Sequence, residues 1–146
     1  MKRILLYGII LIGALMIPVN RLDVEDLEPV QTVWLFREGD RIVLETDTED
    51  KGVGDTLEAA LGDLKENCVG IIYLDTARFL LVAENARDQL ADVKAHLKDS
   101  VKACFWDGEG SVAEAGAYMS AHKLGCALYT WETGGELPVL QLQKNK

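Results

Sequence analysis

Residue types that carry common catalytic and metal chemistry are scarce in this sequence. Only two histidines and three cysteines occur among its 146 residues. No C-x-x-C pair is present, which excludes a zinc site built on that motif, and no G-x-S-x-G marks a serine nucleophile. We therefore expect a protein that is not an enzyme and that uses no cofactor.

Positive charge is also scarce, with 15 lysines and arginines against 24 aspartates and glutamates, a net charge of -9. Lys2 and Arg3 precede every acidic residue, so the chain from Val19 onward holds 13 basic and 24 acidic residues, a difference of -11. Such a surface repels phosphate backbones and anionic lipid headgroups, which argues against nucleic acid as a partner. It tolerates cations and basic protein surfaces, so we expect a protein partner. Self-association stays open.

Charge is absent from the sixteen residues 4–19, ILLYGIILIGALMIPV, which follow Lys2 and Arg3. This pattern predicts a signal anchor or signal peptide at residues 1–20, with membrane contact through residues 4–19. A helix of sixteen residues is roughly 24 Å long, close to the roughly 30 Å hydrocarbon core. Because no A-x-A-like cleavage site lies between Ala14 and Val19, we favour a retained anchor with a cytoplasmic N-terminus. Cleavage, which would give a secreted protein, is the alternative.

The remaining residues, 21–146, are expected to form a single extracytoplasmic α/β domain, since 49% of the chain is hydrophobic and only three prolines occur. Its centre is the stretch from Gly52 to Ala86. Asp55 or Thr56 is placed to cap a helix whose residues Leu57, Ala60, Leu61 and Leu64 form one apolar stripe. The apolar runs Val69–Leu74 and Phe79–Ala83 predict two strands covered on both faces.

Periodicity and turn residues divide the rest of the domain. A hairpin is expected at residues 30–46, and S-x-x-E at Ser111 and Glu114 predicts a capped helix over Val112–His122. The prediction is a mixed sheet of about seven strands with three helices packed on it. The other expected elements are strands at Val30–Arg37, Arg41–Thr46, Val101–Trp106, Leu124–Trp131 and Leu137–Leu142, the last two joined at Gly134-Gly135, and a helix at Glu84–Ser100.

The acidic segment Asp47–Glu58 has the spacing of a calcium loop. Oxygen ligands would come from positions 1, 3, 9 and 12, which are Asp47, Glu49, Asp55 and Glu58, with glycine at position 6. Lys51 occupies the fifth position, where an oxygen ligand is expected, and a strand precedes the loop. A secreted or anchored calcium or small-ligand module is therefore the alternative to a solvated acidic loop that caps the next helix.

Two further places have the polar pattern of a site. Residues 108–113 read G-x-G-x-x-A between a strand and a helix, as in dinucleotide loops, but the flanking carboxylates favour a plain turn before a capped helix. Asp75 and Thr76 lie at the corner between the two central strands and form a candidate polar site.

The cysteines and tryptophans lie among apolar residues and read as core. A disulfide is permitted outside the cytoplasm, and Cys104 and Cys126 are the pair that could be sheet neighbours, but Cys68, Cys104 and Cys126 are better explained as small buried side chains. The three tryptophans, at positions 34, 106 and 131, are expected in the core or at an interface. His96 and His122 lie near helix C-termini, where a partly positive imidazole suits the dipole.

The order of these elements resembles a known family. The segment RLDVEDLEPV, two strands, GDTLEAALGDL and GIIYLDTARFLLVAENA are similar to the N-terminal domain of the C-subunit family of spore-germination receptors. The matching positions are Arg21, Asp26, Leu27, residues 56–61, Ala83 and Glu84.

That resemblance implies a non-enzymatic scaffold in sporulation or germination, tethered on the outer face of the inner spore membrane. It carries over no catalytic residue. Two features depart from the family: its lipid-bearing cysteine is absent here, and its members continue into further domains.

Overall fold

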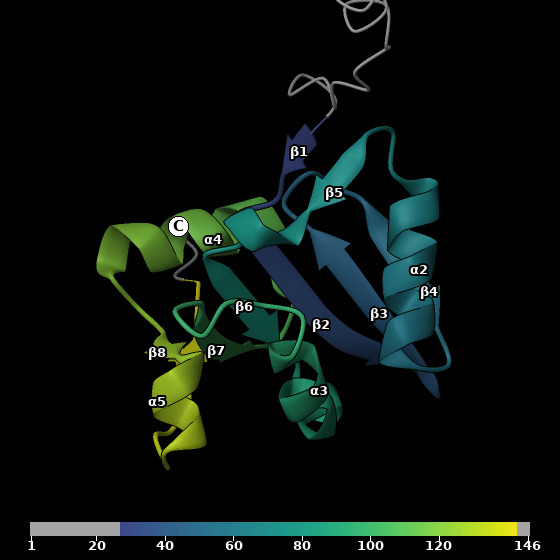
Figure 1. Ribbon diagram of the computed structural model, residues 1–146. Helices are drawn as coiled ribbons and strands as arrows, with labels where there is room; N and C mark the ends of the chain where they lie inside the picture. Colours follow the sequence, from purple (N-terminus) through teal and green to yellow (C-terminus); the bar gives the residue numbers. More distant parts are fainter. Residues whose placement is uncertain (1–26, 143–146) are drawn as a thin grey trace, which may run out of the picture.

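The computed structural model describes residues 27–142, and these form an α/β domain around a mixed sheet of seven strands (Figure 1). The order across the sheet is β4-β3-β2-β6-β7, and both β8 and β9 pair with the outer edge of β7. The bounds are β2 Thr32–Glu38, β3 Arg41–Thr46, β4 Lys51–Gly54, β6 Phe79–Val82, β7 Lys102–Trp106, β8 Cys126–Ala127 and β9 Val139–Leu140.

Strand direction gives the sheet two distinct edges. Strands β2, β6 and β7 run parallel, and β3 returns antiparallel between β2 and β4. The N-terminal ends of β2 and β6 therefore meet at one edge, where Thr32 pairs with Phe79. We call it the entry edge, because β1 (Leu27–Pro29) leads into β2 there. The opposite edge, where β2 and β4 end, is the far edge. Figure 1 shows β1 and β5 at one end of the molecule and α3 and α5 at the other.

Helix α2 (Leu57–Asn67) packs on one face of the sheet in the way the central stretch predicts. Thr56 is the N-cap, and its side chain accepts a hydrogen bond from the Ala59 amide. Leu57, Ala60, Leu61 and Leu64 are the buried residues of the helix, so the predicted apolar stripe is confirmed. The helix lies directly over β4 because Gly52 and Gly54 have no side chain to hold it away.

Two apolar clusters fill the two faces. The face under α2 also carries the segment from η3 (Glu84–Gln89) to α3 (Leu90–Lys94), together with Leu128 of α5 (Leu128–Glu132). The other face lies under α4 (Val112–His122), whose Met119 is fully buried. All four residues of β6 are buried, which confirms that this strand is covered on both faces. The capping box of Ser111 and Glu114 is confirmed as well.

The predicted strand Val69–Leu74 is wrong in length and in place. Only Ile71–Tyr73 forms a strand, β5, and it pairs in parallel with β1 outside the main sheet. Val69 is 98% exposed, Ile71 46% and Tyr73 43%, so the run is not covered on both faces. A short apolar run alone does not indicate whether the strand will lie inside the main sheet or in a separate two-stranded sheet such as that of β1 and β5.

The predicted strand Leu124–Trp131 is mostly wrong. Only Cys126 and Ala127 form a strand, β8, and residues Leu128–Glu132 form helix α5. In this helix the side chain of Leu128 is buried in the core. Strand β9 is shorter than predicted and pairs in parallel with β7, so Gly134-Gly135 does not join a hairpin. The expected helix at Glu84–Ser100 is likewise shorter, since it consists of the 3₁₀ segment η3 and the five residues of α3.

Within residues 27–142, no helix is long and apolar enough to cross a membrane. The predicted anchor at residues 1–20 lies outside the described residues.

Candidate functional site

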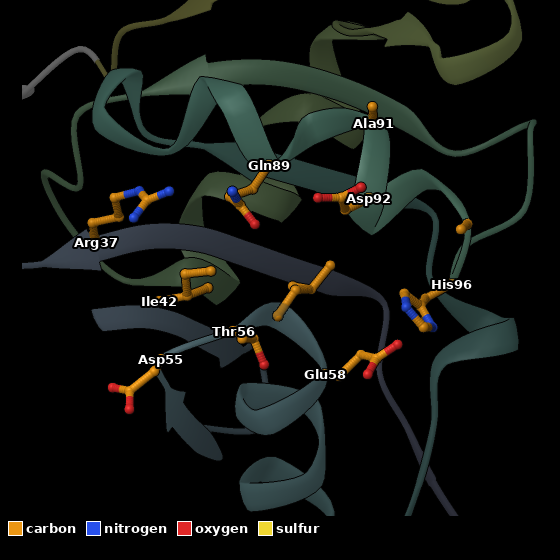
Figure 2. Close-up of a pocket in the computed structure, with 11 residues that line it drawn as sticks. Arg37, Ile42, Asp55, Thr56, Glu58, Gln89, Ala91, Asp92 and His96 are labelled. Atoms are coloured by element: carbon orange, nitrogen blue, oxygen red, sulfur yellow. The ribbon is translucent and has the colours of Figure 1, made fainter. Parts of the chain in front are cut away.

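A hollow lies at the far edge of the sheet, between the first turn of α2 and residues 89–96, which contain α3 and which we call the α3 segment (Figure 2). It has a volume of about 610 Å³ and opens to solvent. We call it the far-edge cleft. Its lining residues are Arg37, Ile42, Asp55, Thr56, Leu57, Glu58, Gln89, Ala91, Asp92, Ala95 and His96.

One wall comes from the start of α2. Because Thr56 caps the helix, Asp55 immediately before it and Glu58 in its first turn lie beside the positive end of the helix dipole. Asp55 also pairs with Arg41, with 3.6 Å between Oδ1 and Nε. The sequence spacing indicated Asp55 and Glu58 as candidate calcium ligands. It therefore singled out two residues of this wall, although it predicted a different kind of site.

The end of β2 is fastened to η3 at the edge of the cleft. The Arg37 amide donates to Asn85 Oδ1 at 3.1 Å, and Asn85 Nδ2 donates to the Arg37 carbonyl at 3.1 Å. The Arg37 guanidinium donates to Asp88 Oδ2 at 2.6 Å. Hydrogen bonds from Gln89 and from Arg37 lower the pKa of the Asp88 carboxyl. The charge of Arg37 is therefore balanced by a carboxylate outside the cleft lining.

The α3 segment supplies the opposite wall with Asp92 and His96. Figure 2 shows Glu58 and His96 facing each other near one end of the cleft, and Arg37 and Asp55 at the other end. Among residues 27–142, neither Glu58 nor Asp92 forms an ion pair, so the cleft holds two carboxylates without a cationic partner. Such a cleft suits a cationic group, for example a lysine or arginine side chain of a partner.

The four calcium-loop candidates do not come together. Strand β4 lies between Glu49 and Asp55, and the Asp47 carboxylate accepts hydrogen bonds from the Gln31 amide at 3.1 and 3.3 Å. Across the described part of the chain, no three histidine, cysteine, aspartate or glutamate side chains are grouped as a metal ion requires. The sequence spacing resembles a calcium loop, but strand β4 separates Asp47 and Glu49 from Asp55 and Glu58.

The corner at Asp75 and Thr76 has a structural role. Thr76 Oγ1 donates to the carbonyls of Val30 at 3.0 Å and Tyr73 at 2.8 Å, which ties β5 to the chain that leads into β2. Asp75 is exposed in the 3₁₀ turn η2 (Leu74–Thr76). Neither Asp75 nor Thr76 is among the residues that line the far-edge cleft.

The G-x-G-x-x-A segment is a turn before a capped helix. Gly108 has a φ of 87°, and a Cβ there would lie 2.7 Å from the Trp34 ring, so the loop packs on the indole. The Ser111 amide donates to the Glu114 carboxylate at 3.2 Å. The start of α4 is thus occupied by its own side chains.

All three cysteines are free thiols. Cys126 pairs in register with Ala103, one residue before Cys104, so the pleat directs Cys104 and Cys126 to opposite faces of the sheet. Burial raises the pKa of the Cys104 thiol to about 12.

The tryptophans belong to the packed interior. Trp34 stacks on Phe36 at 3.9 Å between ring centroids and meets Trp106 edge-on at 4.8 Å. Trp131 packs against the core on the α2 face. His122, the last residue of α4, lies against the Tyr118 ring at 4.1 Å.

Sequence reasoning missed Arg37, Gln89 and Asp92 as lining residues of the far-edge cleft. Each is an ordinary polar residue in its own segment, and only the crossover from β6 through α3 brings these segments opposite α2. No family model, no curated protein and no solved structure matches this chain.

Proposed function

We propose that this chain is a membrane-tethered, outward-facing interaction domain that receives a basic segment of a protein partner in the far-edge cleft. The observation that carries the proposal is the pair Glu58 and Asp92, two carboxylates that line one cleft and form no ion pair within residues 27–142. A partner's lysine or arginine would supply the missing charge. The surplus of acidic residues from Val19 onward would steer such a partner toward the domain.

The position of the cleft fits a tethered protein. If residues 4–19 span the bilayer, the chain enters the domain through β1, beside the entry edge of the sheet. Arg37 and Asp55 lie at the ends of β2 and β4, and they place the cleft at the opposite edge. The cleft would then point away from the membrane and remain accessible.

The resemblance over residues 21–86 suggests the setting. A relative of the C-subunit family would lie on the outer face of the inner spore membrane, and its partner would be another protein of the germination apparatus. Synthesis of the chain only in sporulating cells would support this placement. Equal amounts in growing and sporulating cells would count against it.

Partner capture tests the interaction itself. The full chain is extracted from native membranes with a neutral detergent, after cross-linking in the cells, and the captured proteins are identified. Asp92→Lys reverses a charge in the cleft, whereas Glu66→Lys reverses an exposed charge of α2 outside it. We expect capture to fall about tenfold or more in Asp92→Lys and to persist in Glu66→Lys, since like charges in an interface are strongly unfavourable. A lack of any reproducible partner, or an equal loss in both variants, would refute the proposal.

A further inference from the structure

A second hollow, with a volume of about 440 Å³, lies at the entry edge and carries the opposite charge. It is formed where β6 and β7 begin and where α4 ends. Its cationic residues are Arg78, Lys102 and Lys123, and we call it the basic hollow. The hydroxyl-bearing residues Ser100 and Ser120 complete its polar lining.

Backbone pairing brings the three cations together from distant parts of the sequence. The Arg78 amide donates to the Gln31 carbonyl at 2.8 Å, and the Lys102 amide donates to the Arg78 carbonyl at 2.9 Å. Lys123 ends α4 in the left-handed conformation, with a φ of 53°. Gly125 then lets the chain approach Lys102 closely, because a Cβ at Gly125 would lie only 2.8 Å from the Lys102 Cβ.

These cations differ from most others in the described part of the chain because none of the three forms an ion pair there. Residues 27–142 contain ten lysines and arginines, and five of them form ion pairs: Arg37, Arg41, Lys51, Arg87 and Lys94. Of the five described cations without an ion pair, three line the basic hollow and the other two are Lys65 and Lys98. In a chain with a net charge of -9, this concentration of unpaired positive charge favours an anionic ligand.

We propose that the basic hollow binds a phosphate group. The Arg78 guanidinium lies 5.6 Å from the centre of the Phe79 ring, and stacking there leaves its N–H groups available for a planar, two-point contact with phosphate oxygens. The two lysines add point charges, and the serine hydroxyls can donate to the remaining oxygens. A phosphate group matches this set, since it offers several strong acceptor oxygens around a compact negative charge.

The position of the hollow indicates a lipid headgroup as one source of the phosphate, and this part rests on the proposed tether. Gln31, which holds Arg78, lies two residues after β1. Eight residue steps from Val19 to Leu27 reach at most about 29 Å, so a membrane anchor would keep the entry edge close to the bilayer. The exposed Ile71 and Tyr73 of β5 lie beside β1, which leads into the entry edge, and exposed apolar and aromatic side chains there suit a membrane interface.

Amide chemical shifts of the full chain in neutral detergent micelles test the site. In the first arm, inorganic phosphate is added from micromolar to tens of millimolar concentrations, with chloride at matched ionic strength as the reference. In the second arm, the micelles are doped with phosphatidylglycerol or, as a neutral control, phosphatidylcholine. The variants are Lys102→Gln and Lys123→Gln, and Lys65→Gln removes one unpaired cation away from the hollow.

We expect the amides of residues 78, 102 and 123 to shift with phosphate and not with chloride. Each of the two hollow variants should weaken binding about fivefold, the effect of one unit charge at about 4 Å in water. Lys65→Gln should leave the affinity within about twofold.

A response to phosphatidylglycerol as well identifies a lipid headgroup as a source, and a response to free phosphate alone identifies a soluble phosphate compound. Failure of both arms, or equal weakening in Lys65→Gln, overturns the proposal. Neither result bears on partner capture at the far-edge cleft, so the two proposals fail separately.

Discussion

Replacing Gly52 by alanine tests the close packing of α2 on β4, which positions one wall of the far-edge cleft. A Cβ at Gly52 would lie 2.2 Å from the Ala60 carbonyl oxygen and 2.5 Å from the Cβ and the amide nitrogen of Leu64. Ordinary contacts begin at 3.4 Å, so the helix would have to move outward by about 1.2 Å, the difference between 3.4 and 2.2 Å.

The energetic cost follows from the kind of atoms in the way. They belong to the helix backbone and to Leu64, which is fully buried, so no side-chain rotation relieves the overlap. Overpacking a well-packed interior costs about 1–3 kcal/mol, and we expect the upper end here, about 3 kcal/mol. That is a large share of the roughly 5–15 kcal/mol by which a domain is stable.

Gly62→Ala is the matched control. Gly62 lies in the same helix, but nothing lies within 4 Å of a Cβ placed there. Alanine is favoured over glycine in a helix interior by roughly 0.5–1 kcal/mol, so this variant should be more stable than the parent.

Urea unfolding of the full chain, followed by tryptophan fluorescence, measures both effects. The midpoint should fall for Gly52→Ala and rise for Gly62→Ala, with the denaturant slope unchanged. A Gly52→Ala variant as stable as the parent would refute the described packing of α2 on β4.

Three further predictions concern the helix cap, the buried thiol and calcium. Ser111→Ala removes the capping box of α4 and should lower the free energy of unfolding by about 1 kcal/mol, whereas the exposed Ser120→Ala should change it by less than about 0.5 kcal/mol in urea titrations. Burial raises the pKa of Cys104 from 9.0 to about 12, so above pH 9 an unfolded chain loses this proton while the folded chain keeps it. Stability should therefore fall between pH 9 and 12, by up to about 1.4 kcal/mol per pH unit, and Cys104→Ala should remove that component; the same slope in both proteins would contradict it. Millimolar calcium should leave the thermal midpoint of the full chain unchanged, and a midpoint that rises with calcium would restore the loop of Asp47–Glu58 as a binding site.

The parts of the fold that local patterns determine could be predicted from the sequence. The stripe of α2 and the capping box of α4 depend on residues within one or two helical turns of one another, and the β2–β3 hairpin on two strands joined by a short turn. Their side chains and caps favour one conformation wherever the segment ends up. Strand β6 could be predicted for a related reason, because the continuous apolar run Phe79–Ala83 is typical of a strand covered on both faces, and the structure buries all four residues of β6.

The C-terminal part could not be predicted because its apolar residues fit two periods. Leu128 and Trp131 are three residues apart, as on a helix, yet they lie in a continuous apolar run that also resembles a strand. Packing decides the matter: as a helix, this segment buries Leu128 completely and brings Trp131 against the same cluster. That outcome depends on Val101, whose carbonyl accepts the Leu128 amide, and no local pattern reveals this partner.

The two hollows depend on topology in the same way. The spacing of Asp55 and Glu58 predicted a calcium loop, but their neighbours in the far-edge cleft come from β2 and the α3 segment. In the basic hollow, Arg78 and Lys102 are 24 positions apart and meet only because β6 and β7 pair in parallel. The basic hollow could not be predicted from the net charge, since a strongly acidic chain gives no indication that three unpaired cations lie together at one edge of the sheet.

We propose that a membrane anchor holds this domain outside the cell or on the outer face of the inner spore membrane. Fractionation of the native host, combined with protease added to intact protoplasts, tests it most directly. We predict that the full, unprocessed chain sediments with the membranes, is released by detergent and not by high salt, and is digested by the added protease. Recovery of the intact chain in the soluble cytosolic fraction, protected from that protease, would contradict the claim.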